Sequence, residues 1–186
     1  EKPINIFDSV EIARAIENLD LPPSRIDIGK LTYEFHLEDD KYNDATAFVI
    51  EKLKNAKEYT LKLAEIMPET DYDFRPVPEE MSFKEQIVHI GKNLYWLSST
   101  FISETPDLNK NQSVIAKDMT KDQVIDFVSG AYEFAGQAIM NLGSESLSKE
   151  FAFSGKKLNK FQFLNLIQDH QTHHRAQLIV YLRLKM

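Results

Sequence analysis

Apolar residues recur at helical spacing in four segments of the chain, each about 20 residues long. The second segment, for example, places Ile87, Ile90, Leu94 and Leu97 on one stripe. Apolar side chains three and four positions apart share one face of a helix, which must be buried against a partner. The four segments are Asp44–Met67, Ser82–Ile102, Thr120–Leu142 and Asn159–Lys185. We therefore predict an all-α fold, a four-helix bundle.

Capping residues, a proline and a glycine mark the ends of these segments. Three segments begin with the spacing of a capping box, in which two side chains satisfy each other's backbone N–H groups. These pairs are Ser82 with Glu85, Thr120 with Gln123, and Asn159 with Gln162. We predict Asp44 as the N-cap of the first helix, Pro68 as its stop, and Gly143 as the residue just beyond the third helix.

The remaining segments are predicted to be connections and one appendage. Residues 71–80 hold two prolines and read as an extended loop, as does the stretch 106–118. A short hairpin is expected around Ser154 and Gly155. We divide the chain into an N-terminal arm, residues 1–40, and the bundle, residues 41–186. The arm is expected to contain a short helix at 11–19 and a strand at 30–36.

Composition narrows the classes of function. The 186 residues include no cysteine, so disulfides and cysteine-based metal sites are excluded. The net charge of −7, without a long basic block, argues against nucleic acid as a main partner. No apolar stretch approaches the ~20 residues that span a bilayer. We expect a soluble protein; the absence of cysteine fits both a cytoplasmic and an exported chain, and we favour the cytoplasm.

Histidines carry the candidate chemistry. His170 and His174 stand four apart in the fourth helix, so their side chains differ by about 40° and lie on its buried stripe. Buried imidazoles need partners, which a metal ion or hydrogen-bond acceptors can supply. For this pair, periodicity leaves both interpretations open. His89 falls at the edge of the second helix's stripe, where periodicity alone predicts a half-buried residue.

Two neighbours of the pair limit the chemistry. Residue 171 is Gln, whereas the zinc-protease signature has Glu directly after its first His as the general base, so that class is disfavoured. His173 lies on the shoulder of the helix and diverges from His174, so it does not easily share one ion with the pair. Asp169, Glu85, Tyr95 and His173 are candidates to support a metal site indirectly, although Asp169 points about 100° away from His170 and a solvated carboxylate is favoured there. Arg175 is predicted to be a surface or interhelix ion-pair residue.

Several of these residues together resemble the DinB/YfiT superfamily of metal-dependent enzymes. The matching pieces are the helix bearing His89, the run His170, His174, Arg175, Gln177 and Leu178, and the trailing Tyr181-Leu182-Arg183. The family often has Gly where this chain has Ala176, and residues 1–40 have no counterpart in it. The resemblance implies a four-helix bundle, a homodimer, and one divalent metal ion held by His89, His170 and His174. Nickel or zinc is implied first, with iron or manganese as alternatives, since imidazole nitrogen suits several of these ions.

Two functional hypotheses follow. The first is a metal-dependent transferase or hydrolase that acts on a small molecule by thiol-dependent S-transfer or by hydrolysis, since three protein ligands with an open position are typical of a catalytic metal. Because the chain has no cysteine, a nucleophilic thiol would come from a low-molecular-weight cosubstrate. The second is a non-catalytic helical bundle, a binding or stress-related interaction protein whose histidines are structural.

Overall fold

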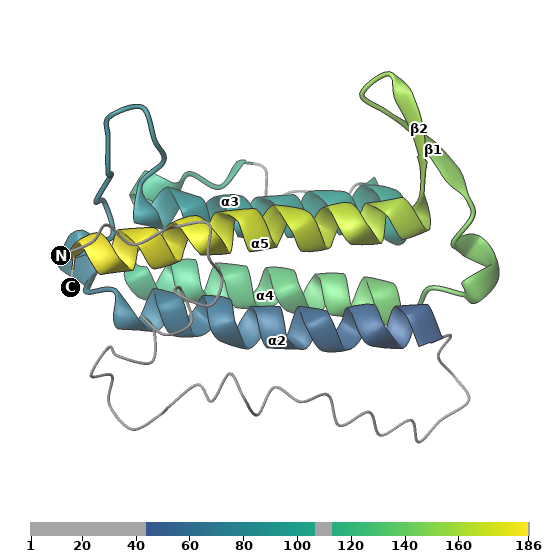
Figure 1. Cartoon of the computed structure of the whole chain (residues 1–186), viewed down its shortest axis with the longest axis horizontal. Coiled ribbons are helices and arrows are strands. Elements are labelled where there is room, and N and C mark those ends of the chain that lie inside the picture. The colour runs from purple at the N-terminus through teal and green to yellow at the C-terminus, as the bar shows by residue number, and fades with distance from the viewer. Residues whose placement is uncertain (1–43, 107–112, 186) are drawn as a thin grey trace, which may run out of the picture. The chain divides into compact units, whose positions relative to one another are not determined.

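Each of the four periodic segments forms a helix. The computed structural model describes residues 44–106 and 113–185, so the predicted arm, with its short helix and the strand that ends at His36, lies outside the described residues. The α-helices are α2 (Asp44–Ile66), α3 (Phe83–Leu97), α4 (Lys121–Met140) and α5 (Lys160–Lys185). Figure 1 shows them running side by side. The predicted all-α four-helix bundle is confirmed.

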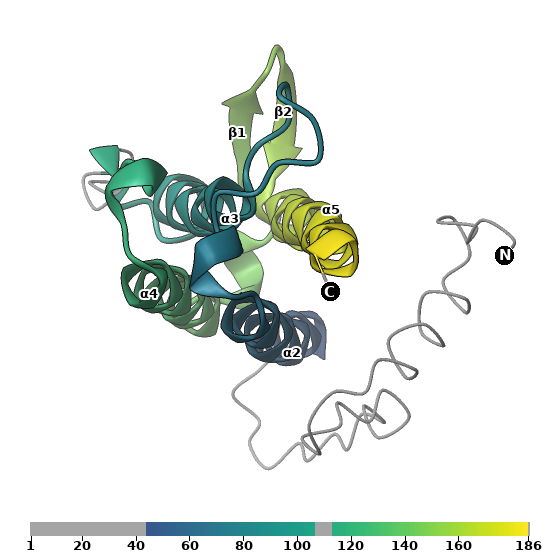
Figure 2. The ribbon, with the colours of Figure 1, turned by 90° about the vertical axis from the view of Figure 1, so that its left-hand side faces the viewer.

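The arrangement of the helices decides which residues can meet. Seen end-on in Figure 2, the four helices stand at the corners of a square. α3 packs against α4 and α5, and α2 packs against the same two helices. Consecutive helices α2 and α3 therefore lie on a diagonal, as do α4 and α5. The two helices that carry the candidate histidines, α3 and α5, are neighbours.

The core lies where the four helices face one another. Fully buried side chains come from all four helices, with Ala64, Ile87, Val128 and Ile167 among them. At one end of the bundle the ring of Phe163 stacks on the ring of Phe101, with centroids 4.0 Å apart. Among the described residues, no helix combines the length and the apolar character needed to cross a membrane.

Side-chain caps fix three helix starts. The Ser82–Glu85 and Thr120–Gln123 pairs form capping boxes at α3 and α4. Before α5, the Asn159 N–H donates to Gln162 Oε1 and the Gln162 N–H donates to Asn159 Oδ1, both at 2.9 Å. All three predicted caps are confirmed. Because each cap uses residues three apart, these starts are set locally.

Two predicted helix ends are wrong. Asp44 is the first residue of α2 and not the residue before it. α4 ends at Met140 with Asn141 as its C-cap, and Gly155 is the one described glycine with a positive φ. Gly143 therefore does not supply the left-handed residue predicted just beyond the helix. The chain instead turns into a short 3-10 helix, η7 (Ser144–Ser146), in which the Ser146 N–H donates to Gly143 O at 3.0 Å.

The second segment was predicted as one helix to Ile102, but it changes type on the way. α3 ends at Leu97, and a π-helix, η3 (Ser98–Ile102), follows it. The Ser103 N–H donates to Ser98 O, five residues back, at 2.9 Å. Hydroxyls help to hold this wider turn, since Ser103 Oγ also donates to Ser98 O. Apolar periodicity does not distinguish the two helix types over five residues.

The predicted hairpin is confirmed between α4 and α5. β1 (Glu150–Phe153) pairs antiparallel with β2 (Lys156–Asn159), with Phe153 opposite Lys156. The two loop residues, Ser154 and Gly155, have φ of 49° and 77°. Two left-handed residues in a two-residue loop are the pattern of a type I′ turn. The ring of Phe153 packs against the rings of Trp96 and Phe101, which fixes the hairpin to the bundle.

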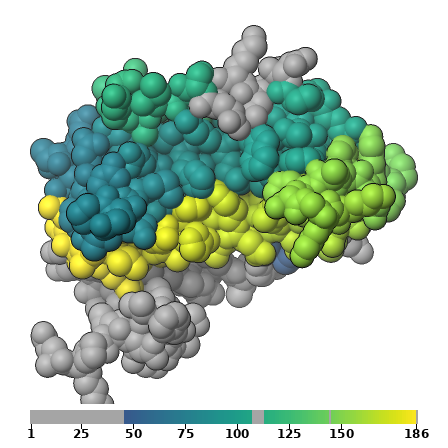
Figure 3. All heavy atoms as spheres, turned by 90° about the horizontal axis from the view of Figure 1, so that it is seen from above, coloured from purple at the N-terminus to yellow at the C-terminus, as the bar shows by residue number. Residues whose placement is uncertain are grey.

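Other connections contain short 3-10 helices. The α2–α3 connection contains η2 (Glu69–Asp71) and is otherwise irregular, as the two prolines within residues 71–80 predict. The predicted loop before α4 contains η6 (Ala116–Asp118). Seen from above in Figure 3, the α2–α3 connection and the hairpin stand at opposite ends of the face formed by α3 and α5.

Candidate metal centre

Three histidines come together where α3 meets α5. His89 projects from α3, and His170 and His174 project from successive turns of α5. One ring nitrogen from each lies within 4.8 Å of the others. The ring centroids of His89 lie 4.8 Å from His170 and 4.5 Å from His174. Among the described residues, this group of three gathers no fourth His, Asp or Glu, so a bound ion would keep positions open to other ligands.

Hydrogen bonds orient the rings. His89 Nε2 and His170 Nε2 lie 3.0 Å apart, so one of the two can donate to the other. His174 Nδ1 lies 2.5 Å from Gln86 Oε1. Because an amide oxygen only accepts, Nδ1 of His174 carries the proton, and its Nε2 is left with a free lone pair. This is the tautomer that a metal ligand requires.

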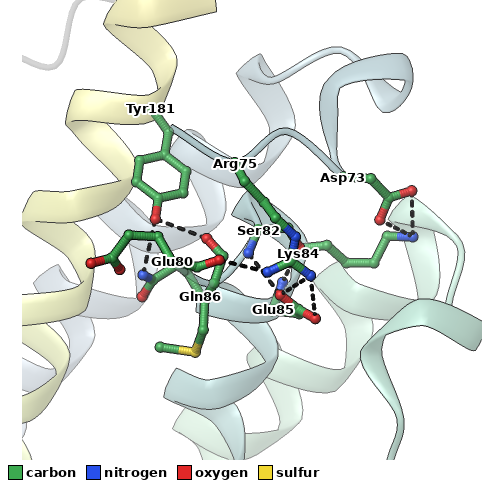
Figure 4. Close-up of polar contacts among 9 residues, drawn as sticks. Asp73, Arg75, Glu80, Ser82, Lys84, Glu85, Gln86 and Tyr181 are labelled. Atoms are coloured by element: carbon green, nitrogen blue, oxygen red, sulfur yellow. Dashed lines mark hydrogen bonds and ion pairs between the residues drawn. The ribbon is translucent and has the colours of Figure 1, made fainter. Parts of the chain in front are cut away.

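Gln86 holds His174 through a chain of hydrogen bonds. Its side chain is fully buried, and its Nε2 donates to Tyr181 Oη at 3.3 Å. Tyr181 Oη in turn donates to the backbone oxygen of Met81 at 2.8 Å. Figure 4 shows Tyr181 reaching from α5 toward Gln86 on α3. The ring of His174 is thereby tied to α3 and to the segment just before it.

Burial keeps these histidines neutral. Desolvation lowers the pKa of His170 to about 3 and that of His174 to about 4, and the neighbouring imidazoles add to both shifts. The pKa of His89 is also lowered, chiefly by burial and further by the charge of Lys92. His174 is buried, while His89 and His170 are half-buried, as periodicity predicted for His89. Near neutral pH all three carry the free lone pair that a divalent ion needs.

The supporting residues differ from those that the sequence suggested. Asp169 is exposed, and Tyr95 packs against Phe127 and Phe134 on α4. Glu85 caps α3 and pairs with Arg75, as Figure 4 shows. None of these three is seen to contact the histidines. Asp169 is the solvated carboxylate that its direction on the helix favoured, whereas Glu85 and Tyr95 do not take the supporting role for which they were candidates.

His173 has an intermediate position. Its ring lies 4.9 Å from that of His174, but its side chain is exposed, and its Nε2 lies 3.4 Å from Gln177 Nε2. His173 therefore stands beside the group of three without joining it.

Sequence reasoning missed Gln86. It precedes His89 by three residues on one helix, so the two side chains lie on adjacent turns. That spacing was the available signal. Gln is a common residue on helices, however, and only the packing of α3 against α5 brings its amide to His174.

Comparison with known proteins settles the family. The sequence pattern of the DinB superfamily matches residues 52–178, which include all three histidines. The chain belongs to the DinB superfamily. It is 23% identical over 146 residues to the uncharacterised protein YjoA of Bacillus subtilis strain 168, covering 73% of this chain and 87% of YjoA.

Solved DinB-like structures share the fold. The crystal structure of YjoA superposes with a TM-score of 0.60 at 22% identity, covering 73% of this chain and 90% of YjoA. A DinB-family protein from Exiguobacterium sibiricum gives 0.63 at 22% identity, covering 76% and 92%. A DinB-like protein from Bacillus cereus gives 0.59 at 19% identity, covering 74% and 90%. At these identities the likeness concerns the bundle.

Proposed function

We propose that this DinB-superfamily protein is a metal-dependent enzyme that acts on a small molecule by thiol-dependent S-transfer or by hydrolysis. The observation that carries the proposal is the group of three neutral imidazoles, with one nitrogen of each within 4.8 Å of the others. The proposed ligands are His89, His170 and His174, and the proposed ion is nickel or zinc. The family resemblance also favours a homodimer, which sedimentation equilibrium would test.

The donor set fits such an ion. Imidazole nitrogen suits nickel, zinc and iron, and the ring of His174 already has its Nδ1 committed to Gln86. A divalent ion held here would act as a Lewis acid and lower the pKa of a water or thiol that reached it. The residues of the chain hold the three rings and keep them neutral by burial, and no fourth His, Asp or Glu of the described residues joins the group.

The competing hypothesis has its own support. His89 and His170 hydrogen-bond to each other at 3.0 Å, and His174 bonds to Gln86, so the rings satisfy part of their polar demand without an ion. A non-catalytic bundle could keep three histidines for that purpose. The two hypotheses differ in metal content, which makes metal content the first measurement.

The test compares untagged wild type with two single variants, purified without chelators. Elemental analysis should find about one divalent ion per chain in the wild type and its loss in His170→Ala. His173→Ala is the matched control, because it removes an exposed imidazole from the same helix outside the group of three. Wild type without bound metal, and with no thermal shift on adding nickel or zinc, would refute the metalloenzyme hypothesis.

Activity is tested on the metal-loaded protein. Glutathione with a chromogenic alkylating agent probes S-transfer, and nitrophenyl esters probe hydrolysis. Turnover should disappear in His170→Ala and remain in His173→Ala. A fully loaded protein that turns over none of these probes would favour the non-catalytic bundle.

A further inference from the structure

A second polar cluster lies on the side of α5 that faces α2, partly within the bundle. Arg175 from α5, Tyr59 and Thr60 from α2, and Tyr132 from α4 form it, with Tyr59 and Arg175 half-buried. Gln171 precedes Arg175 by one turn of α5 and so stands on the same side of that helix. Thr60 and Tyr132 are buried, and their hydroxyls lie 2.9 Å apart. The Arg175 guanidinium lies 5.5 Å from the centroid of the Tyr59 ring. Three helices thus contribute polar groups to one partly buried region.

Gln171 is the unusual residue on this side of α5. Its side chain is 1% exposed, yet both its Nε2 and its Oε1 lack a hydrogen-bond partner among the described residues. A buried amide with both ends unpaired costs about 1–3 kcal/mol for each group. Other buried glutamines of the bundle, Gln86 and Gln168, both find partners. A ligand that accepts one hydrogen bond and donates another would therefore satisfy both ends of the Gln171 amide.

Arg175 adds an uncompensated positive charge. Its Nη2 donates to Thr172 Oγ1 at 3.3 Å, while its Nη1 is inaccessible to solvent and has no partner in the described part of the chain. None of the ion pairs between described residues includes it. The guanidinium also makes a hydrogen-bonding contact with the Tyr132 hydroxyl, and this contact and its charge both oppose the rise in that hydroxyl's pKa caused by burial. Within residues 44–106 and 113–185, the predicted ion-pair role of Arg175 is thus not seen.

Gln171 and Arg175 lie one helical turn apart, so their unpaired groups stand on adjacent turns of α5. We propose that this cluster binds the carboxylate of a small molecule inside the bundle, between α2 and α5. One carboxylate can accept from Arg175 Nη1 and from Gln171 Nε2 together. The site goes beyond the function proposed above, because it requires no metal ion and uses none of the three metal-site histidines.

The unpaired acceptor Gln171 Oε1 indicates which kind of carboxylate the cluster would bind. A ligand that carries an O–H group next to its carboxylate would donate to this oxygen and satisfy the whole amide. Hydroxy acids have this chemistry, and so does hydrogencarbonate. Acetate offers the carboxylate alone, and chloride offers neither feature. We therefore expect glycolate to bind more tightly than acetate, and chloride not to bind at the site.

The experiment measures the melting temperature, Tm, of the full chain against glycolate, hydrogencarbonate, acetate and chloride at constant ionic strength and pH. A ligand at ten times its Kd should raise Tm by about 3–5 °C, and the rise should saturate. Calorimetric titration should give one site per chain. Glycolate and hydrogencarbonate are separate arms, so the result distinguishes an organic acid from the inorganic ion.

Two variants make the test specific. Arg175→Met and Gln171→Leu should each abolish the saturable shift, and Gln171→Leu keeps the core volume if the arginine variant folds poorly. Lys54→Met is the matched control, because it removes one exposed positive charge from α2. Metal content should be unchanged in all three, which separates this site from the metal centre.

The proposal would be overturned by either of two results. One is that no carboxylate gives a saturable shift of Tm in the wild type. In that case, a Tm of Gln171→Leu above that of the wild type, both without added ligand, would show that the buried amide only destabilises the core. The other is a saturable shift that survives in Arg175→Met. Equal affinity for acetate and glycolate would refute the role given to the ligand's hydroxyl.

Discussion

Replacing Gln86 by Leu tests whether the bond from His174 to Gln86 controls the proposed metal centre. The substitution keeps a buried side chain of similar size on α3 but removes the acceptor that lies 2.5 Å from His174 Nδ1. His174 is 7% exposed, so its N–H would be left buried and unpaired. Such a group costs about 1–3 kcal/mol of folding free energy. Tyr181 would keep its bond to Met81 O, which limits the loss.

Gln86→Leu should also weaken metal binding, and by more than its loss of folding stability alone would cause. Without Gln86 the ring of His174 can rotate or place its proton on Nε2, and either change removes a ligand. Loss of such an orienting partner typically weakens metal affinity about 10–100-fold. That factor corresponds to about 1.4–2.7 kcal/mol of binding free energy. Competition against a metallochromic indicator measures the Kd for zinc and nickel directly.

Gln168→Leu is the matched control. Gln168 is also buried, and its side chain donates to Val49 O at 3.5 Å on the α2 side, away from the histidines. It should alter stability by less than about 1 kcal/mol, since a bond of this length is weak, and leave the Kd unchanged. A Kd in Gln86→Leu within twofold of wild type would refute the orienting role, and equal weakening in both variants would show a general effect of core polarity.

Three further predictions concern stability. Gly91→Ala should destabilise the fold by about 1–3 kcal/mol in urea unfolding, because the added Cβ would lie 2.6 Å from the Phe127 ring. Ser82→Ala should cost about 1 kcal/mol in the same assay through loss of the α3 cap. The Tm of metal-free protein should fall as the pH falls from about 6.5 toward 3–4. In this range unfolded histidines bind protons, whereas in the folded protein His170, with a pKa of about 3, and His174, with a pKa of about 4, stay neutral. His170→Ala should make Tm depend less steeply on pH. If Tm of the variant falls as steeply as Tm of the wild type, the low pKa of His170 is not a cause of the decline.

Sequence reasoning reached the bundle because its signals are local. A capping box needs two residues three apart, and an amphipathic stripe needs one helix. The two-residue turn at Ser154 and Gly155 is equally local. The same reasoning failed at the π-helix after Leu97, because a change from i+4 to i+5 bonding leaves the apolar spacing almost unchanged over five residues.

The site was only partly predictable for the same physical reason. His170 and His174 could be paired from one helix, but His89 joins them through packing across 81 residues of chain. Periodicity placed His89 at a half-buried edge, and the family resemblance raised it to a ligand. Neither could find Gln86, Gln171 or the surroundings of Arg175, since these depend on which helices face each other.

The three capped helix starts also have a consequence for the order of events in folding. α3, α4 and α5 each carry their own start signal, so they can form as local structure before the bundle closes, as is typical of fast-folding helical proteins. The histidine group depends instead on contacts between α3 and α5, such as the bond from Gln86 to Tyr181, 95 residues away. Undocking of α5 would therefore abolish the site while leaving the helices themselves intact. Hydrogen exchange can measure the opening of the α3–α5 interface and the unfolding of each helix separately. Ligand affinity should follow the opening of the interface more closely than the unfolding of any helix.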